Sequence, residues 1–203
     1  MEVVATKTAK GRPREFCPDQ ALAAALRVFW QRGFESASMA ELTEAMGITK
    51  PSLYAAFGNK EALFRKALDL YEREKLGYVQ TALDAPTARG VAERLLTGAL
   101  QMQSNTCDPK GCLGVISSVA CGVEAEGIRS EVIARRASSQ TALIERFERA
   151  RQEGELPDGL DAEGLARYLL ALLQGLSVQA GSGASCEQLR ALVETSLQVW
   201  PTK

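Results

Sequence analysis

The fold is decided by residues 38–57, which read SMAELTEAMGITKPSLYAAF and contain two short helical patterns joined by a glycine turn. Ser38, followed three residues later by Glu41, forms a capping box and predicts that a helix begins here. Gly47 is expected to end that helix, because the left-handed backbone at a helix C-terminus favours glycine. Thr49 is the expected N-cap of the next helix. The stretch therefore predicts helix, turn, helix.

The turn at residues 47–49 is too short for the two helices to lie antiparallel, so they must cross steeply, with Ile48 between them. This is the helix-turn-helix geometry, in which the second helix can enter the major groove of DNA. That helix exposes Lys50, Ser52 and Tyr54, which can donate hydrogen bonds to phosphates or bases. A helical hairpin inside an all-α bundle would show the same spacing, so the pattern alone leaves both interpretations open.

Outward from this stretch, almost every segment follows the helical period, and no strand alternation appears. We therefore predict an all-α fold of about nine helices, one of them a single long helix over residues 59–83. The predicted organisation is a basic arm at residues 1–14, a three-helix DNA-binding domain at residues 15–60 and a helical domain for ligand binding and dimerisation at residues 61–203.

Composition excludes several classes of function. The 203 residues include 24 Lys and Arg and 25 Asp and Glu, a net charge of -1, which excludes a uniformly basic nucleic-acid coat. Residues 1–66 nevertheless carry ten basic and seven acidic side chains, so an anionic partner is expected only there. Histidine is absent, which removes histidine-based catalysis and most zinc sites. We therefore expect no enzyme activity, cofactor or metal.

Nothing in the sequence indicates export or membrane insertion. No signal peptide is recognisable, and no run of about 18 apolar residues is present. The five cysteines are an odd number without the spacing of a disulfide scaffold. A reduced, cytoplasmic setting without a membrane partner is the expectation.

Residues 33–63 resemble the DNA-binding domain of the TetR/AcrR family of bacterial transcriptional regulators. The matching segments are Gly33-Phe34, Met39-Ala40-Glu41-Leu42, Met46-Gly47-Ile48-Thr49-Lys50, Leu53-Tyr54-Ala55-Ala56-Phe57 and Asn59-Lys60-Glu61-Ala62-Leu63. The run Leu-Tyr-x-x-Phe-x-x-Lys-Glu-x-Leu is specific to that family, and the helical remainder fits its variable C-terminal domain. The resemblance implies a homodimeric repressor that binds a palindromic operator in double-stranded DNA.

The resemblance also implies roles for the residues that match the family's motif. The expected contacts with phosphates or bases are Ser38, Thr49, Lys50, Ser52, Tyr54 and Lys60. Ala55 and Ala56 stand where larger polar residues are common, so contact with thymine methyl groups is expected from them. Upstream, Arg12 and Arg14 lie beside glycine and proline in an extended arm suited to a narrow minor groove. An ordinary basic tail is the alternative for that arm.

Three cysteines, Cys107, Cys112 and Cys121, cluster in the C-terminal part of the chain. Cys112 follows a turn and has Lys110 nearby, and an adjacent cation favours the reactive thiolate. Some proteins of the resembled family sense oxidants or electrophiles through such a cysteine. The alternative is that the cysteines pack as small hydrophobic residues.

A reversible organic effector is the competing hypothesis to a cysteine sensor. It requires only an apolar pocket between the C-terminal helices, with Met102, Leu113 and Leu143 as expected lining residues. Either kind of signal, a small molecule or an electrophile, would release the repressor from its operator.

The last two helices have strongly apolar faces, and burial within one chain is the simplest account of them. The family resemblance implies instead a four-helix dimer bundle built from Leu169, Leu173, Leu192 and Val193. A dimer also suits DNA binding, because two recognition helices can meet two half-sites about one helical turn apart. The alternative to a DNA-binding regulator is an all-α small-molecule-binding protein or enzyme in which the helix-turn-helix is only structural.

Overall fold

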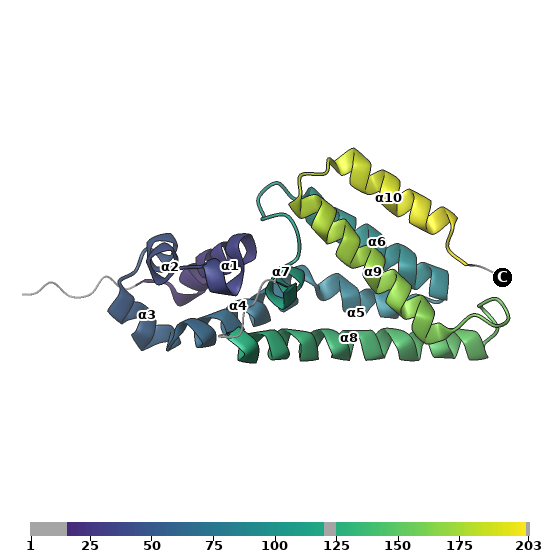
Figure 1. Ribbon diagram of the computed structural model, residues 1–203, viewed down its shortest axis with the longest axis horizontal. Helices are drawn as coiled ribbons and strands as arrows, with labels where there is room; N and C mark the ends of the chain where they lie inside the picture. The colour runs from purple at the N-terminus through teal and green to yellow at the C-terminus, as the bar shows by residue number, and fades with distance from the viewer. Residues whose placement is uncertain (1–15, 120–124, 202–203) are drawn as a thin grey trace, which may run out of the picture.

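The computed structural model describes residues 16–119 and 125–201, which form ten α-helices and no β-strand, so the all-α fold class is confirmed. The helices are α1 (Pro18–Ser36), α2 (Met39–Met46), α3 (Lys50–Phe57), α4 (Lys60–Lys75), α5 (Gly77–Leu83), α6 (Ala88–Ser104), α7 (Leu113–Val119), α8 (Glu126–Gln152), α9 (Ala162–Gly181) and α10 (Cys186–Gln198). Helices α1–α3 form one end of an elongated molecule, and α6, α9 and α10 lie toward the other end (Figure 1).

The expectation of about nine helices is one short, because residues 59–83 form two helices rather than one. Leu76 separates α4 from α5 with φ −106° and ψ 7°, outside helical values. Gly77 follows it, and glycine inside a helix costs about 1 kcal/mol relative to alanine. Leu76 packs instead against the core around α1 and α4.

The local signals in residues 38–57 are confirmed. Ser38 Oγ accepts the Glu41 N–H at 3.1 Å, and the Glu41 carboxylate accepts the Ser38 N–H at 3.0 Å. Gly47 adopts the left-handed conformation with φ 65°, and the Ile48 N–H bonds to the Thr43 carbonyl at 3.1 Å. Ile48 packs against the core as expected, so the short turn is closed by both hydrogen bonding and apolar contact.

The described residues bury two apolar cores. The first joins α1–α4 through Phe29, Leu42, Leu53 and Phe64, and it also takes in residues of α7 and the start of α8. The second joins α5, α6, α8, α9 and α10, with Phe147 fully buried within it. The helix-turn-helix therefore stands on a core that also includes part of the C-terminal half.

Gly33 lets α7 approach α1 closely. Its φ of 76° interrupts the regular helix of α1. A Cβ at this position would also lie 3.2 Å from Cγ2 of Ile116 on α7. Any larger residue would be strained by its backbone and crowded by that side chain.

Ion pairs join α4 to α8. Arg65 Nε lies 2.7 Å from Glu131, while Arg135 Nη1 lies 2.6 Å from Asp69 and 2.9 Å from Glu72. Burial alone would raise the pKa of Glu131, but the hydrogen bonds from Arg65 and Arg135 outweigh it and lower that pKa. Each pair is partly exposed and contributes little alone, but together they fix α8 along α4.

Within residues 16–119 and 125–201, none of the helices combines the length and the apolar character that a bilayer crossing requires.

Candidate functional site

Helix α3 separates its apolar side chains from its polar ones. Leu53 and Phe57 are buried against the first core, whereas Lys50 and Tyr54 face solvent, Tyr54 with 47% of its surface exposed. Ser52 is half-buried, and its hydroxyl lies 2.9 Å from that of Thr49, which caps the helix. The exposed face is therefore free to contact phosphates and base edges.

The start of α2 is built in a similar way. Ser38 accepts a backbone N–H and keeps its own hydroxyl hydrogen for donation. The backbone and side-chain hydrogen bonds from Ser38 lower the pKa of Glu41. Ser38 and Thr49 thus stand at two helix N-termini, where backbone N–H groups favour anions.

Lys60 has a structural partner that the sequence did not indicate. Its Nζ donates to the Glu35 carbonyl at 3.1 Å and lies 4.7 Å from the centre of the Phe34 ring. Burial lowers the pKa of Lys60, and the charge of Glu35 opposes that change. The ammonium group therefore ties the start of α4 to the end of α1, at the edge of the same unit that presents α3.

Three of the expected site residues, Arg12, Arg14 and Cys121, lie outside the described residues.

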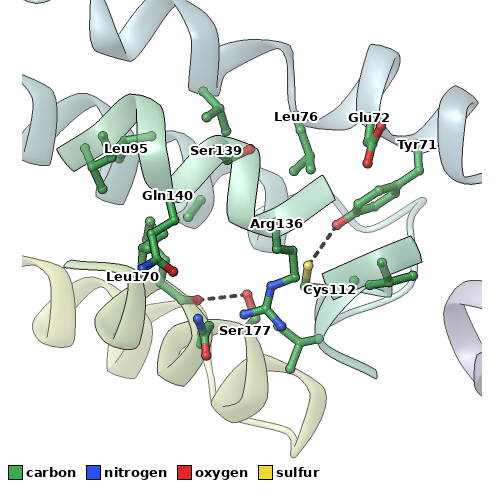
Figure 2. A pocket seen from close by; sticks show the side chains of 18 of the residues that line it. Tyr71, Glu72, Leu76, Leu95, Cys112, Arg136, Ser139, Gln140, Leu170 and Ser177 are labelled. Carbon is green, nitrogen blue, oxygen red and sulfur yellow. Dashed lines mark hydrogen bonds between the residues drawn. The ribbon is translucent and has the colours of Figure 1, made fainter. Parts of the chain in front are cut away.

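A cavity of about 340 Å³ lies between α4, α5, α6, α7, α8 and α9 (Figure 2). Its wall is mostly aliphatic, including Leu68, Leu76, Val79, Leu83, Leu95, Ala99, Met102, Val115, Val132, Ile133, Leu143, Leu170 and Leu173. Its polar groups come from Tyr71, Glu72, Tyr78, Cys112, Arg136, Ser139, Gln140, Gln174 and Ser177. A volume and lining of this kind are typical of sites for small organic ligands.

The structure brings together three of the expected effector residues on this wall, Met102, Cys112 and Leu143. The expectation for Leu113 is wrong, because this side chain is fully buried in the first core and does not line the cavity. It begins α7, and the short helix directs it toward α1. Cys107 is exposed in the connection between α6 and α7 and lies apart from the wall.

The Cys112 thiol has a phenol as its neighbour rather than an ammonium group. The Tyr71 hydroxyl donates to Cys112 Sγ at 3.4 Å and lies 4.0 Å from Met102 Sδ. Burial, and then the proximity of Cys112, raise the pKa of Tyr71 well above its usual value, so the phenol keeps its proton. Lys110 is not the cation beside the thiol that the sequence predicted. Its ammonium group instead donates to the carbonyls of Gln103 and Asn105 at the end of α6.

Gly111, the residue before Cys112, makes three buried hydrogen bonds through its carbonyl and its N–H. Its carbonyl accepts from Trp30 Nε1 at 3.2 Å and from Gln103 Nε2 at 3.0 Å, while its N–H donates to Gln103 Oε1 at 2.8 Å. The Trp30 ring also stacks edge-on against Tyr71 with centroids 4.8 Å apart. Helix α1 is therefore bonded directly to the segment that carries Cys112.

The segment around Gly111 has a second anchor. Lys75, the last residue of α4, lies 2.6 Å from Asp108, and both side chains are mostly buried. Asn105 donates to the same carboxylate at 2.8 Å. The loop after α6 is thus fastened to α4 as well as to α1. No sequence pattern predicts the pairing of Lys75 with Asp108, because the two residues are 33 positions apart.

The expected dimer residues do not lie on an outer surface. Leu169 and Val193 are buried in the second core, in which α6 packs against both α9 and α10 and α8 packs against α9. Leu173 lines the cavity, and Leu192 packs against the second core. Leu169 and Val193 are thus buried within this chain, whereas Leu173 and Leu192 are half-buried, and their assignment to a dimer interface stays a prediction.

A different set of apolar residues faces outward on these helices. Tyr168 is 41% exposed, Val178 is 54% exposed, and Val199 just after α10 is 64% exposed. Ala171 is exposed between the first two on α9. The sequence signal for this outer face is weak, because small and polar residues interrupt it.

Comparisons with known proteins agree with the geometry of α1–α4. Residues 21–67 match the model of the family described as bacterial regulatory proteins, tetR family. The HTH-type transcriptional repressor ComR of Escherichia coli (strain K12) is 32% identical over 197 residues, 96% of this chain and 94% of that protein. The repressor BdcR of the same organism is 32% identical over 185 residues, 89% of this chain and 87% of its own length.

A solved structure extends the likeness to a complex with DNA. It contains a cysteine mutant of CifR, a TetR family transcriptional regulator, with a 26-base-pair operator duplex. The sequence identity is 43%, the TM-score is 0.86, and the match covers 94% of this chain and 100% of that chain.

The hydrogen bonds at Gly111 predict a difference between two glutamines of α6. Gln103→Ala leaves the buried Gly111 N–H without its acceptor and should lower the free energy of unfolding by about 1–3 kcal/mol. Gln101→Ala changes an exposed neighbour on the same helix and should alter it by less than about 0.5 kcal/mol. Denaturant unfolding of both variants measures this. Equal effects would mean that the Gln103 carboxamide does not stabilise the segment.

Proposed function

Since this chain belongs to the TetR family of bacterial regulatory proteins, we propose that it represses transcription from a palindromic operator and is released when an effector occupies the cavity beside Cys112. It is a DNA-binding transcriptional repressor. The alternative, an all-α binding protein or enzyme with a structural helix-turn-helix, is not supported, since the relatives over most of its length are named as transcriptional repressors. A cytoplasmic location in a bacterium is part of the proposal.

The observation that supports operator contact is the exposed face of α3. Lys50 and Tyr54 stand on it, and Ala55 and Ala56 are exposed beside them, while Leu53 holds the helix from behind. Long side chains are few, so we assign phosphate contacts to the polar residues and thymine-methyl contacts to the alanines. Ser38, Ser52, Thr49 and Lys60 complete the proposed contact set.

The effector must bind more tightly to a conformer whose recognition helices do not match the operator, since otherwise nothing would be regulated. The support for such coupling is the bond between α1 and the cavity wall. Trp30 of α1 bonds to Gly111, and Tyr71 of α4 lines the cavity while it packs against Trp30. A ligand that displaces Cys112 or Tyr71 would therefore act on both helices that carry the helix-turn-helix.

A covalent signal is the second candidate, and the position of Cys112 favours it. The thiol is half-buried, lines the cavity and accepts a hydrogen bond from Tyr71. Addition of an electrophile would introduce volume into a packed segment, and overpacking of this kind costs about 1–3 kcal/mol. A change of that size shifts a balance between two conformers by about fivefold to about 150-fold.

We also propose a homodimer, with the outer face of α9 and the end of α10 as its interface. Tyr168, Ala171, Val178 and Val199 supply exposed apolar surface there. Two copies joined in this way would present two copies of α3 to the two halves of a palindrome.

Operator binding should depend steeply on salt, and Lys60 tests the contact set. If Lys60 neutralises one phosphate, Lys60→Ala should make the slope of log affinity against log salt shallower by about 0.9. Lys66→Ala removes an equal charge from the exposed side of α4, farther from its N-terminus, and should leave the slope unchanged. Fluorescence anisotropy with a labelled operator duplex measures both slopes.

If Lys60→Ala loses affinity but keeps the same slope, Lys60 does not contact a phosphate and only stabilises the fold through its bond to the Glu35 carbonyl. Thermal unfolding of the variant separates this structural loss from the loss of a phosphate contact. A similar change of slope in Lys66→Ala would indicate a general charge effect.

The proposed interface predicts that Val178→Glu dissociates the dimer. A carboxylate buried there without a partner should cost about 2 kcal/mol or more, which is a rise of about thirtyfold in the dissociation constant. Ala134→Glu adds the same charge to an exposed position of α8 and should leave the assembly intact. Sedimentation equilibrium measures the two constants. An intact Val178→Glu dimer would place the interface on another face.

The covalent signal predicts that Cys112→Ser abolishes operator release by peroxide or a quinone, while the parent and Cys107→Ser respond. Cys107 is the matched control, because its thiol is exposed but lies away from the cavity wall. The fraction of operator that remains bound after treatment is the readout. If Cys112→Ser releases the operator as the parent does, the thiol is not the sensor and the reversible effector stands alone.

A further inference from the structure

The cavity contains a guanidinium group without an acidic partner among residues 16–119 and 125–201. Arg136 of α8 is half-buried, and its only hydrogen bond among these residues runs from Nη1 to Ser118 Oγ at 2.8 Å. Its sequence neighbour Arg135 bonds instead to three carboxylates, those of Asp69, Glu72 and Glu131. Figure 2 shows the Arg136 side chain reaching from α8 toward Ser177, with the Cys112 thiol beside its stem.

The carboxylate on the cavity wall does not neutralise the positive charge of Arg136. Glu72 is the acidic residue among the described lining residues, and its carboxylate is 2.9 Å from Arg135 Nη1. Arg135 therefore compensates Glu72 from outside, and the positive charge of Arg136 remains. A cation in partly apolar surroundings favours an anionic partner, because water screens the pair poorly there.

The polar end of the cavity is compact. A Cβ on Gly114 would lie 3.8 Å from Cys112 Sγ and 3.9 Å from Cδ of Arg136, so the thiol and the arginine stem flank one glycine. The remaining wall is mostly aliphatic, with Leu83 and Leu95 among its residues. The cavity thus combines one charged end with an apolar body.

We propose that this cavity binds an amphipathic organic anion, whose carboxylate pairs with Arg136 and whose apolar part lies against the aliphatic wall. Nε and Nη2 of Arg136 have no partner among the described residues, and this edge of a guanidinium matches a carboxylate through two parallel hydrogen bonds. The bond to Ser118 orients the fork before the ligand arrives. The inference deepens the proposed effector function and rests on it only for the consequence at the operator.

The test compares head groups of equal chain length in the full chain. Octanoate, 1-octanol and octylamine are titrated calorimetrically in the absence of DNA. Octanoate should bind about tenfold or more tightly than octanol, and octylamine should bind most weakly. Equal binding of octanoate and octanol by the parent chain overturns the proposal, whatever any variant does.

Two variants on α8 assign the preference to its residue. Arg136→Met keeps an unbranched apolar stem but removes the guanidinium group, and it should reduce octanoate affinity to that of octanol. Arg129→Met is the matched control, because Arg129 is exposed, bonds to the Ser118 carbonyl at 3.4 Å and does not line the cavity. An unchanged octanoate affinity in folded Arg136→Met contradicts the proposal. Arg136→Lys, which keeps the charge but not the fork, should retain a weaker preference for the carboxylate.

The regulatory role is tested separately by adding octanoate to the complex with operator DNA and measuring how much DNA is released. Release of the operator by octanoate in the parent and in Arg129→Met, but not in Arg136→Met, supports both the ligand class and the effector function. Arg136-dependent binding that leaves the operator complex intact supports the ligand class and contradicts the proposed effector function.

Discussion

The buried hydrogen bond from Trp30 Nε1 to the Gly111 carbonyl is the interaction on which the two halves of this protein depend. A buried indole N–H without an acceptor destabilises the fold, and here the acceptor of the Trp30 N–H is the backbone beside Cys112. Gln103 holds the same peptide through both its N–H and its carbonyl, so the segment has little freedom to shift alone. Movement at the cavity wall must therefore either break this arrangement or carry α1 with it.

Helix α4 provides a second, longer connection between the same two places. Its first residue, Lys60, is bonded to the end of α1, Tyr71 lines the cavity, and its last residue, Lys75, is paired with Asp108 in the loop before Gly111. Arg65 and its neighbours on α4 also pair with α8, which contributes Arg136 to the cavity. An effector in the cavity would thus contact α4, which is bonded to α1, and α8, which is paired with α4. The difference in the effector's affinity for the two conformers would set the size of the response.

Short sequence motifs correctly predicted the helix ends, because a helix end depends on residues close together in the chain. The capping box at Ser38, the left-handed Gly47 and the N-cap Thr49 depend on residues within one turn, and the structure has all three. The periodicity of α9 and α10 showed that Leu169 and Val193 are buried but not which element covers them. The prediction that Leu113 lines the cavity was wrong for the same reason, since an apolar residue can pack either in a core or on a cavity wall. The Trp30–Gly111 bond spans 81 residues and has no sequence signature.

The positions of Arg136 and Cys112 make reversible and covalent signals alternatives at one place. Cys112 Sγ and Cδ of Arg136 both lie within 4 Å of the same point above Gly114, so the proposed carboxylate ligand and an adduct on the thiol would share one end of the cavity. Either proposed occupant would contact the residue next to Gly111, and the hydrogen bond from Trp30 to Gly111 would couple a displacement there to α1. Under this proposal one cavity would serve two kinds of signal through one mechanism of release, because both would act on the same peptide.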